Sequence, residues 1–354
     1  MTCCSMPWGY KLVTSLAMAM LFGCSADGGS TGAGAGGSAG NNGTTTGGSG
    51  AGGAGGNVSN VYQPVTASNQ NNLYTLQMGP IKLVVDASVG ARITEFSYDG
   101  TNVLTGSEVD TNTAPPAHNN YGSTFWTSPQ STWNWPPVTA IDSLPYTGSV
   151  DSPNNSIQLV SQVATIGGAQ LTLTKKFVAV PSSGAIDVVY SLANAASSVK
   201  LTAAPWQISR VAGSGSLTFF GKGIGTYTNS GTLSLTEQDG IYWYNFVAAS
   251  GDSKAKSDGL GWIAHATASS LLLLFSYPDV QPSEVATNEA EVEIYTGAHG
   301  DYVEIEPQGV YQDIVPGSAL EWTVRWKLRK IPSGTAVAVG STDLATFAQQ
   351  QLSQ

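Results

Sequence analysis

The residue pair most suited to acid–base chemistry is Glu304 and Glu306, two positions apart in the run YVEIE. Alternating apolar and polar residues predict a strand over 302–306, and side chains two apart on a strand lie on one face. Repulsion between two carboxylates on one face can raise the pKa of one of them, as in a tuned general acid or base. A solvated strand face is the alternative, because Glu291 and Glu293 have the same spacing outside any motif.

Three histidines could supply a second proton-transfer group. His299 lies in a Gly-Ala-His-Gly turn just before the glutamate strand, and His118 lies in the loop PPAHNN. Either could reach over a pocket as a proton donor, whereas His265 lies inside a predicted strand, which favours a structural role. The three positions have no metal-ligand spacing, so we expect no metal site.

The stretch 123–137, STFWTSPQSTWNWPP, contains three tryptophans, three prolines and no charge. Such a run fits neither a helix nor a plain strand. Trp126, Trp133 and Trp135 could offer flat apolar faces to sugar C–H groups while Gln130 orients hydroxyls, a common pattern in ligand pockets. The same aromatics could instead close one end of the fold as a packed structural loop. Both interpretations are open at this point.

Composition excludes several other classes of protein. A net charge of −10, with no cluster of Lys or Arg, argues against a nucleic-acid partner. The cysteines are Cys3, Cys4 and Cys24, so the rest of the chain has neither a disulfide framework nor a cysteine-ligated zinc site. No Gly-x-Ser-x-Gly elbow, P-loop or dinucleotide fingerprint follows a strand, and we expect no cofactor.

The N-terminus has the pattern of an export signal. The apolar run 12–22 is too short to span a bilayer and is typical of a signal-peptide core. The next residues complete Leu-Phe-Gly-Cys, which resembles the bacterial lipobox. This resemblance implies a signal peptide over 1–23 and acyl chains on Cys24, which would anchor the protein stably in a membrane of the cell envelope. Ser25 favours the outer membrane over the inner one.

The segment 24–57 is rich in Gly, Ser and Ala and predicts a disordered tether after the lipidated cysteine. Its 25–56 portion has an r.m.s. reach of about 30 Å as a flexible coil. We expect a folded domain over 58–332 and a tail over 333–354. In the tail, apolar residues at helical spacing predict a short helix over 341–352, with Ser341 or Thr342 as its cap.

Between 58 and 332 the chain reads as a succession of strands. Asp99-Gly100 after an alternating run is a hairpin signature. Three further strands over 156–166, 169–180 and 185–194 predict a β-meander, and LLLLF (271–275) predicts a strand buried on both faces. About a dozen or more strands predict a large all-β, antiparallel sandwich or barrel.

In order along the chain, five segments are similar to the galactose-mutarotase-like (aldose 1-epimerase-like) β-supersandwich, and to a bacterial branch of that group more than to the mutarotases themselves. They are VVDASVGARITEFSYDGTNVL, FWTSPQSTWNWPP, LTAAPWQISRV and EVEIYTGAHGDYVEIEPQG with VPGSALEWTVRW. The resemblance spans nearly the whole domain and implies a supersandwich that recognises a carbohydrate.

The resemblance also implies roles for single residues. Mutarotases use a strand-end Glu as general base and a His as general acid, and the run Ile-Glu-Pro-Gln nominates Glu306 as the base. The acid would fall in the segment 205–208, which here has no histidine. Ring opening needs both groups, so His299 would have to supply the acid from elsewhere. Trp206 and Arg210, in this replacing segment, are expected to face the same cavity.

Arg92 is expected on an inner strand, where its guanidinium needs a carboxylate, backbone carbonyls or an anionic ligand. A structural ion pair is the favoured interpretation. The leading hypothesis for the chain is a monomeric, lipid-anchored carbohydrate-binding protein without standard mutarotase activity. A sugar-modifying enzyme with Glu306 as base is the first alternative, and a purely structural surface protein is the second.

Overall fold

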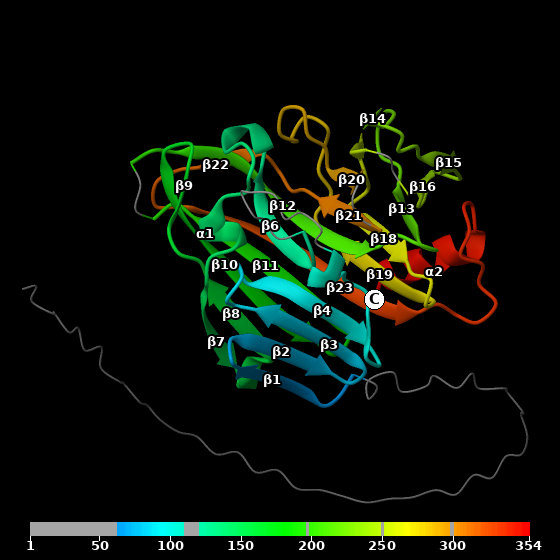
Figure 1. Cartoon of the computed structure of the whole chain (residues 1–354), viewed down its shortest axis with the longest axis horizontal. Coiled ribbons are helices and arrows are strands. Elements are labelled where there is room, and N and C mark those ends of the chain that lie inside the picture. Colours follow the sequence, from blue (N-terminus) through cyan, green and yellow to red (C-terminus); the bar gives the residue numbers. More distant parts are fainter. Residues whose placement is uncertain (1–61, 110–119, 196–197, 249–250, 298–300) are drawn as a thin grey trace, which may run out of the picture. The chain divides into compact units, whose positions relative to one another are not determined.

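The computed structural model describes residues 62–109, 120–195, 198–248, 251–297 and 301–354 (Figure 1). The predicted signal peptide, Cys24 and the tether lie outside these residues, as do His118 and His299. The described residues form two antiparallel sheets of 12 and 11 strands, so the all-β prediction is confirmed. No helix among them is long and apolar enough to cross a membrane.

The 12-stranded sheet follows the order β1-β2-β3-β4-β6-β12-β21-β20-β17-β14, with β5 beside β4 and β22 beside β12. Its strands are β1 (Val65–Gln70), β2 (Leu73–Met78), β3 (Ile81–Asp86), β4 (Arg92–Tyr98), β5 (Thr101–Asn102), β6 (Ser123–Ser128), β12 (Leu201–Ala212), β14 (Thr228–Ser230), β17 (Ser253–Ser257), β20 (Val292–Thr296), β21 (Tyr302–Pro307) and β22 (Gln312–Ile314).

The 11-stranded sheet follows the order β15-β16-β13-β18-β19-β23-β11-β10-β8-β7, with β9 beside β10. Its strands are β7 (Thr147–Asp151), β8 (Ser156–Val160), β9 (Ala164–Ile166), β10 (Ala169–Val180), β11 (Ala185–Ala193), β13 (Leu217–Gly221), β15 (Thr236–Gln238), β16 (Ile241–Asn245), β18 (Trp262–Ala266), β19 (Leu271–Ser276) and β23 (Ala319–Lys330).

The two sheets pack face to face over one large apolar core. Aromatic pairs join them, such as Phe125 of β6 with Tyr190 of β11, whose ring centroids are 4.8 Å apart. Gln207 of β12 accepts hydrogen bonds from the Tyr190 hydroxyl and from the Trp326 indole of β23, both at 3.0 Å. The side chain of Gln207 therefore lies between the sheets, and its even-numbered neighbours on β12 point to the opposite face.

Local sequence signals match the structure at several points. The Asp99-Gly100 turn joins β4 to β5, and both of its residues have positive φ (48° and 80°), as a two-residue hairpin turn requires. Leu271–Phe275 is buried along its whole length, as predicted. Helix α2 (Thr342–Leu352) begins at Ser341, whose hydroxyl accepts from the Leu344 N–H.

Helix α2 packs on the outer side of the 11-stranded sheet, where Leu344 and Ala348 are fully buried against side chains of β18 and β19. The other helices among the described residues are the short α1 (Thr139–Asp142) and three 3₁₀ turns, Ser107–Val109, Gln130–Thr132 and Ser152–Asn154. Because α1 and the Gln130–Thr132 turn follow β6 directly, they place the residues of the tryptophan-rich stretch beside that strand.

The single strand predicted over 156–166 is wrong, because the structure has two strands there, β8 and β9. Both pair with β10. The hydroxyl of Ser161 accepts from the Leu173 N–H at 2.9 Å and so replaces a backbone carbonyl in the ladder. The chain bulges at this point and Val163 is exposed, which a periodic pattern does not reveal.

Candidate functional site

The candidate residues come together on the face of the 12-stranded sheet that points away from the second sheet, called here the outer face. Strand register decides this arrangement: Trp206 lies opposite Trp126, Arg210 lies opposite Glu304, and Glu293 lies opposite Glu306. Because Gln207 points inward, the even-numbered side chains of β12 and their cross-strand partners on β6 and β21 share the outer face.

Four tryptophans form a cluster on this face. Trp126 lies at its centre, with the rings of Trp133, Trp135 and Trp206 packed edge-on against it at centroid distances of 5.5–5.8 Å. Trp206 and Trp126 are buried, whereas Trp135 is 46% exposed. The two interpretations of the stretch 123–137 therefore concern different residues: Trp126 is packed, as a structural loop requires, and Trp135 is the tryptophan of the stretch with the most exposed surface.

The Gln130–Thr132 turn is hydrogen-bonded to Glu289, which lies just before β20. The Gln130 backbone N–H donates to Glu289 Oε1 at 3.2 Å, and the Trp133 indole donates to the Thr127 carbonyl at 2.8 Å. Gln130 is half-buried beside the cluster. These contacts hold the loop that carries Trp135 over the outer face.

Arg92 forms a buried ion pair with Asp142 at 2.9 Å, the structural interpretation favoured from the sequence. Asp142 also accepts from the Trp126 indole at 2.9 Å and from Thr124 at 3.1 Å. Burial raises the pKa of Asp142, but the Arg92 guanidinium and these donors outweigh it and hold the pKa below its ordinary value. Nothing in the sequence indicated that Asp142 is the partner of Arg92, because Asp142 lies on α1, 50 residues away.

Arg210 forms a second buried ion pair, from its Nε to Glu304 Oε1 at 2.9 Å. Its guanidinium lies 5.7 Å from the centroid of the Trp126 ring. Both terminal nitrogens, Nη1 and Nη2, are buried without a hydrogen-bond partner among the described residues. Its donors are thus only partly used, and they face the tryptophan cluster.

Glu306 is fully buried between Trp206 and Lys254. Its Oε2 accepts from the Trp206 indole at 3.1 Å and from Lys254 Nζ at 2.9 Å, while Oε1 has no partner among the described residues. Burial raises the pKa of Glu306 to about 8, although Lys254 opposes this. The neighbouring carboxylates of Glu304 and Glu293, the latter bound to the same Lys254 at 2.7 Å, also raise the pKa of Glu306.

The charged network continues beyond the residues nominated from the sequence. Lys256 contacts Glu289 at 2.6 Å and Glu293 at 3.3 Å. Lys254 and Lys256 are two apart on β17, with Lys256 opposite Glu293 of β20 and Lys254 opposite Tyr295, so the alternation Lys-x-Lys was the available signal. Glu293, whose spacing from Glu291 is also that of a solvated strand face, is fully buried and contacts both lysines.

A general acid that acts together with Glu306 would have to be a nearby side chain able to donate a proton, and few described residues qualify. His265 lies on β18 and points toward the first sheet from within the core, with Nδ1 2.9 Å from the Thr218 hydroxyl. Burial lowers the pKa of His265 to about 4. Trp206 and Lys254 are the described side chains that donate to Glu306.

The raised pKa of Glu306 predicts a pH-dependent stability. An unfolded Glu has a pKa of about 4.3, so between that value and about 8 the native state binds more protons than the unfolded one. The free energy of unfolding should therefore fall as pH rises through this window. Glu306→Gln lacks this titration, and its stability relative to the wild type should rise by at least about 1 kcal/mol from pH 5 to pH 8 in urea unfolding. Parallel pH profiles of the two proteins would contradict the raised pKa.

Comparisons with known proteins concern the fold. No protein-family model matches the chain, and no curated protein matches it significantly. A TPR-domain containing protein from Parabacteroides distasonis is 11% identical with a TM-score of 0.50, over 75% of this chain and 49% of that one. A galactose mutarotase-like protein from Clostridium acetobutylicum is 9% identical with a TM-score of 0.46, over 75% and 98%.

A galactose mutarotase related enzyme from Lactobacillus acidophilus is also 9% identical with a TM-score of 0.46, over 74% of this chain and 98% of that one. The described residues form two packed antiparallel sheets, a large β-sandwich of the kind that the sequence resemblance implied. At these identities the likeness is one of fold and assigns no substrate or activity to this chain.

Proposed function

We propose that this chain is a lipid-anchored cell-envelope protein that binds a carbohydrate on the outer face of its 12-stranded sheet. The anchor is inferred from the lipobox-like residues ending at Cys24, and the Gly-rich segment after them would let the domain reach a glycan away from the membrane. The binding role is inferred from the side chains of the outer face.

A group of unpartnered polar atoms on this face carries the proposal. Four residues on neighbouring strands or just beyond them have buried atoms without a hydrogen-bond partner among the described residues: Ser128, Arg210, Glu306 and Gln308. A buried polar group without a partner is unfavourable, and such groups are rare in proteins. A molecule rich in hydroxyl groups both donates and accepts hydrogen bonds, so it could satisfy all four.

Trp135 supplies the apolar part of such a site. Its ring is packed edge-on against Trp126 and is 46% exposed, so it can stack on the C–H face of a sugar ring. Polar groups below an aromatic wall form the usual arrangement of a ligand pocket. We infer that a sugar enters beside Trp135 as the loop that carries this residue opens.

Trp135→Ala should weaken carbohydrate binding by about tenfold or more, because stacking contributes on the order of 1.4 kcal/mol or more to such contacts. A glycan array on the full-length protein in mild detergent would identify a ligand, and calorimetry would measure both proteins. Phe347→Ala, which removes a partly buried aromatic from α2, is the matched control and should bind like the wild type. If no glycan binds the wild type, the tryptophan stretch is a structural loop and the proposal is wrong.

Sugar epimerisation is the second candidate, favoured by the raised pKa of Glu306. A carboxyl with a pKa of about 8 exchanges protons readily near neutral pH. Glycans that bind should then be followed by NMR for interconversion of their anomers. Turnover that disappears in Glu306→Gln would make the protein an enzyme, whereas binding without turnover would leave recognition as its function.

A further inference from the structure

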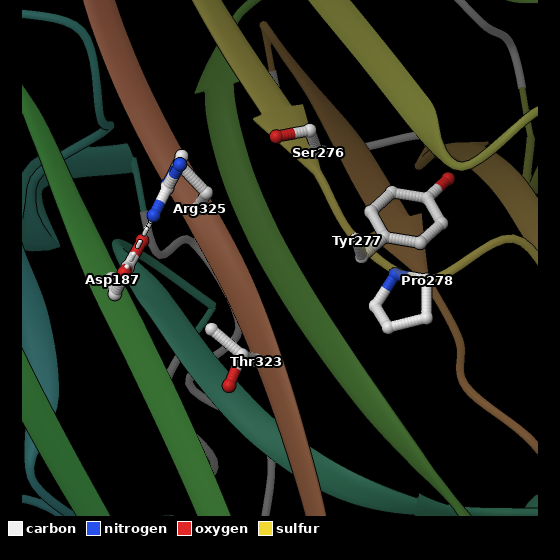
Figure 2. Close-up of a pocket in the computed structure, with 6 residues that line it drawn as sticks. All are labelled: Asp187, Ser276, Tyr277, Pro278, Thr323 and Arg325. Carbon is white, nitrogen blue, oxygen red and sulfur yellow. Dashed lines mark hydrogen bonds and ion pairs between the residues drawn. The ribbon is translucent and has the colours of Figure 1, made fainter. Parts of the chain in front are cut away.

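A hollow of about 300 Å³ lies on the second sheet, on the face that points away from the first (Figure 2). It forms where β19 ends at Ser276 while β23 continues alongside β11. Its lining residues are Asp187, Ser276, Tyr277, Pro278, Thr323 and Arg325. A volume of about 300 Å³ is at the lower end of the range for ligand pockets and suits a single sugar ring.

One side of the hollow is polar and fixed in place. Arg325 binds Asp187 through two parallel hydrogen bonds, Nε to Oδ1 at 2.7 Å and Nη2 to Oδ2 at 2.9 Å. Such a forked pair is rigid and has no net charge. Both members remain partly exposed, at 39% and 20% of their side-chain surface, so they keep donor and acceptor capacity toward the hollow.

The opposite side is apolar. Figure 2 shows Tyr277 and Pro278 across the hollow from Arg325 and Asp187, with Thr323 below and Ser276 above. The Tyr277 ring is supported from behind by Trp322, with centroids 6.1 Å apart. Pro278 is the exposed part of this wall and can pack against the C–H face of a sugar, whereas Tyr277 is 8% exposed and supports the wall from the core.

We propose that this hollow is a second carbohydrate site, which binds one neutral saccharide unit. The two charged groups in its lining, Arg325 and Asp187, are paired with each other, which favours a neutral ligand over an ion. Its other polar groups, the hydroxyls of Ser276 and Thr323, donate and accept alike, as sugar hydroxyls do. The hollow shares no residue with the outer face of the first sheet, so it can exist whether or not that face binds a ligand.

The test uses full-length protein carrying Trp135→Ala, in which binding at the first face is expected to be about tenfold or more weaker. The probes are neutral hexasaccharides of glucose, galactose, mannose and xylose, measured by calorimetry and saturation-transfer NMR. Ser276→Tyr fills the hollow, and Thr323→Tyr fills it from the other side should the first variant fold poorly. Thr174→Tyr places the same side chain on the same face outside the hollow, as the matched control.

Binding of at least one hexasaccharide that falls about tenfold or more in the filling variants, but not in Thr174→Tyr, would support the site. Equal binding in filled and control proteins would overturn it, as would the absence of any binding to Trp135→Ala. Binding of only acidic saccharides, such as a uronic acid oligomer, would overturn the neutral class. Because the Trp135 face is tested in the otherwise unmodified chain, failure of one site does not imply failure of the other.

Discussion

Asp142→Ala should lower the free energy of unfolding by about 3–5 kcal/mol, the usual effect of removing one partner from a buried ion pair. The substitution leaves the Arg92 guanidinium without a carboxylate in a site that has no exposed surface. It also removes the acceptor of the Trp126 indole and of Thr124. The cost is therefore the burial of an uncompensated charge together with two unsatisfied donors.

Urea unfolding of Asp142→Ala and of the control Glu95→Ala measures this loss of free energy against that of an exposed ion pair. Glu95 also pairs with a cation, Lys82 at 2.9 Å, but both side chains are partly exposed. Removing an exposed partner should change the free energy of unfolding by no more than about 1 kcal/mol. Equal losses in the two variants would mean that the Arg92 pair contributes no more than a surface salt bridge.

Lys254→Met should have the next largest effect, a loss of about 3 kcal/mol at pH 8. Lys254 is the cation that contacts Glu306, and it also contacts Glu293. Without it, two buried carboxylates face each other across β20 and β21. The expected loss is at the lower end for a buried pair because the lysine side chain is 22% exposed and part of its charge is already screened.

This loss should depend on pH. At pH 5 Glu306 can take up a proton, so Lys254→Met should destabilise the protein less there than at pH 8. Adding Glu306→Gln to Lys254→Met should recover part of the stability at pH 8. Lys256→Met is the matched control, because Lys256 contacts Glu289 and Glu293 but not Glu306, and Glu306→Gln should not rescue it. A loss of the same size at pH 5 and pH 8 would contradict the proposed protonation of Glu306.

Local sequence patterns were sufficient to predict the class of fold and the position of single strands, turns and helices. The strand over 302–306, the Asp99-Gly100 hairpin and the α2 helix with its Ser341 cap each depend on residues a few positions apart. Because the strand period is two, placing Glu304 and Glu306 on one face also followed from the sequence. The Ser161 bulge did not follow, because the hydroxyl that interrupts the ladder acts on a residue of the next strand.

The candidate site depended on which strands became neighbours. Trp126, Trp206 and Glu306 are far apart in the chain and meet because β12 pairs with β6 on one side and with β21 on the other. The expected inner position of Arg92 predicted that its guanidinium needs a partner, but the sequence did not identify that partner as Asp142. Lys254 reaches Glu306 only through the order β21-β20-β17.

The sequence by itself determined an antiparallel β domain and the shared face of residues two apart on a strand, such as Glu304 and Glu306. The tertiary structure alone decided the ion pairs, which side chain of the tryptophan cluster stays exposed, and where β19 stops short of β23 to leave a hollow. The reason is physical: alternation and turn chemistry act over a few residues, whereas burial, pKa and cavity shape arise from contacts between residues far apart in the chain, from 50 positions for Arg92 with Asp142 to 138 for Arg325 with Asp187.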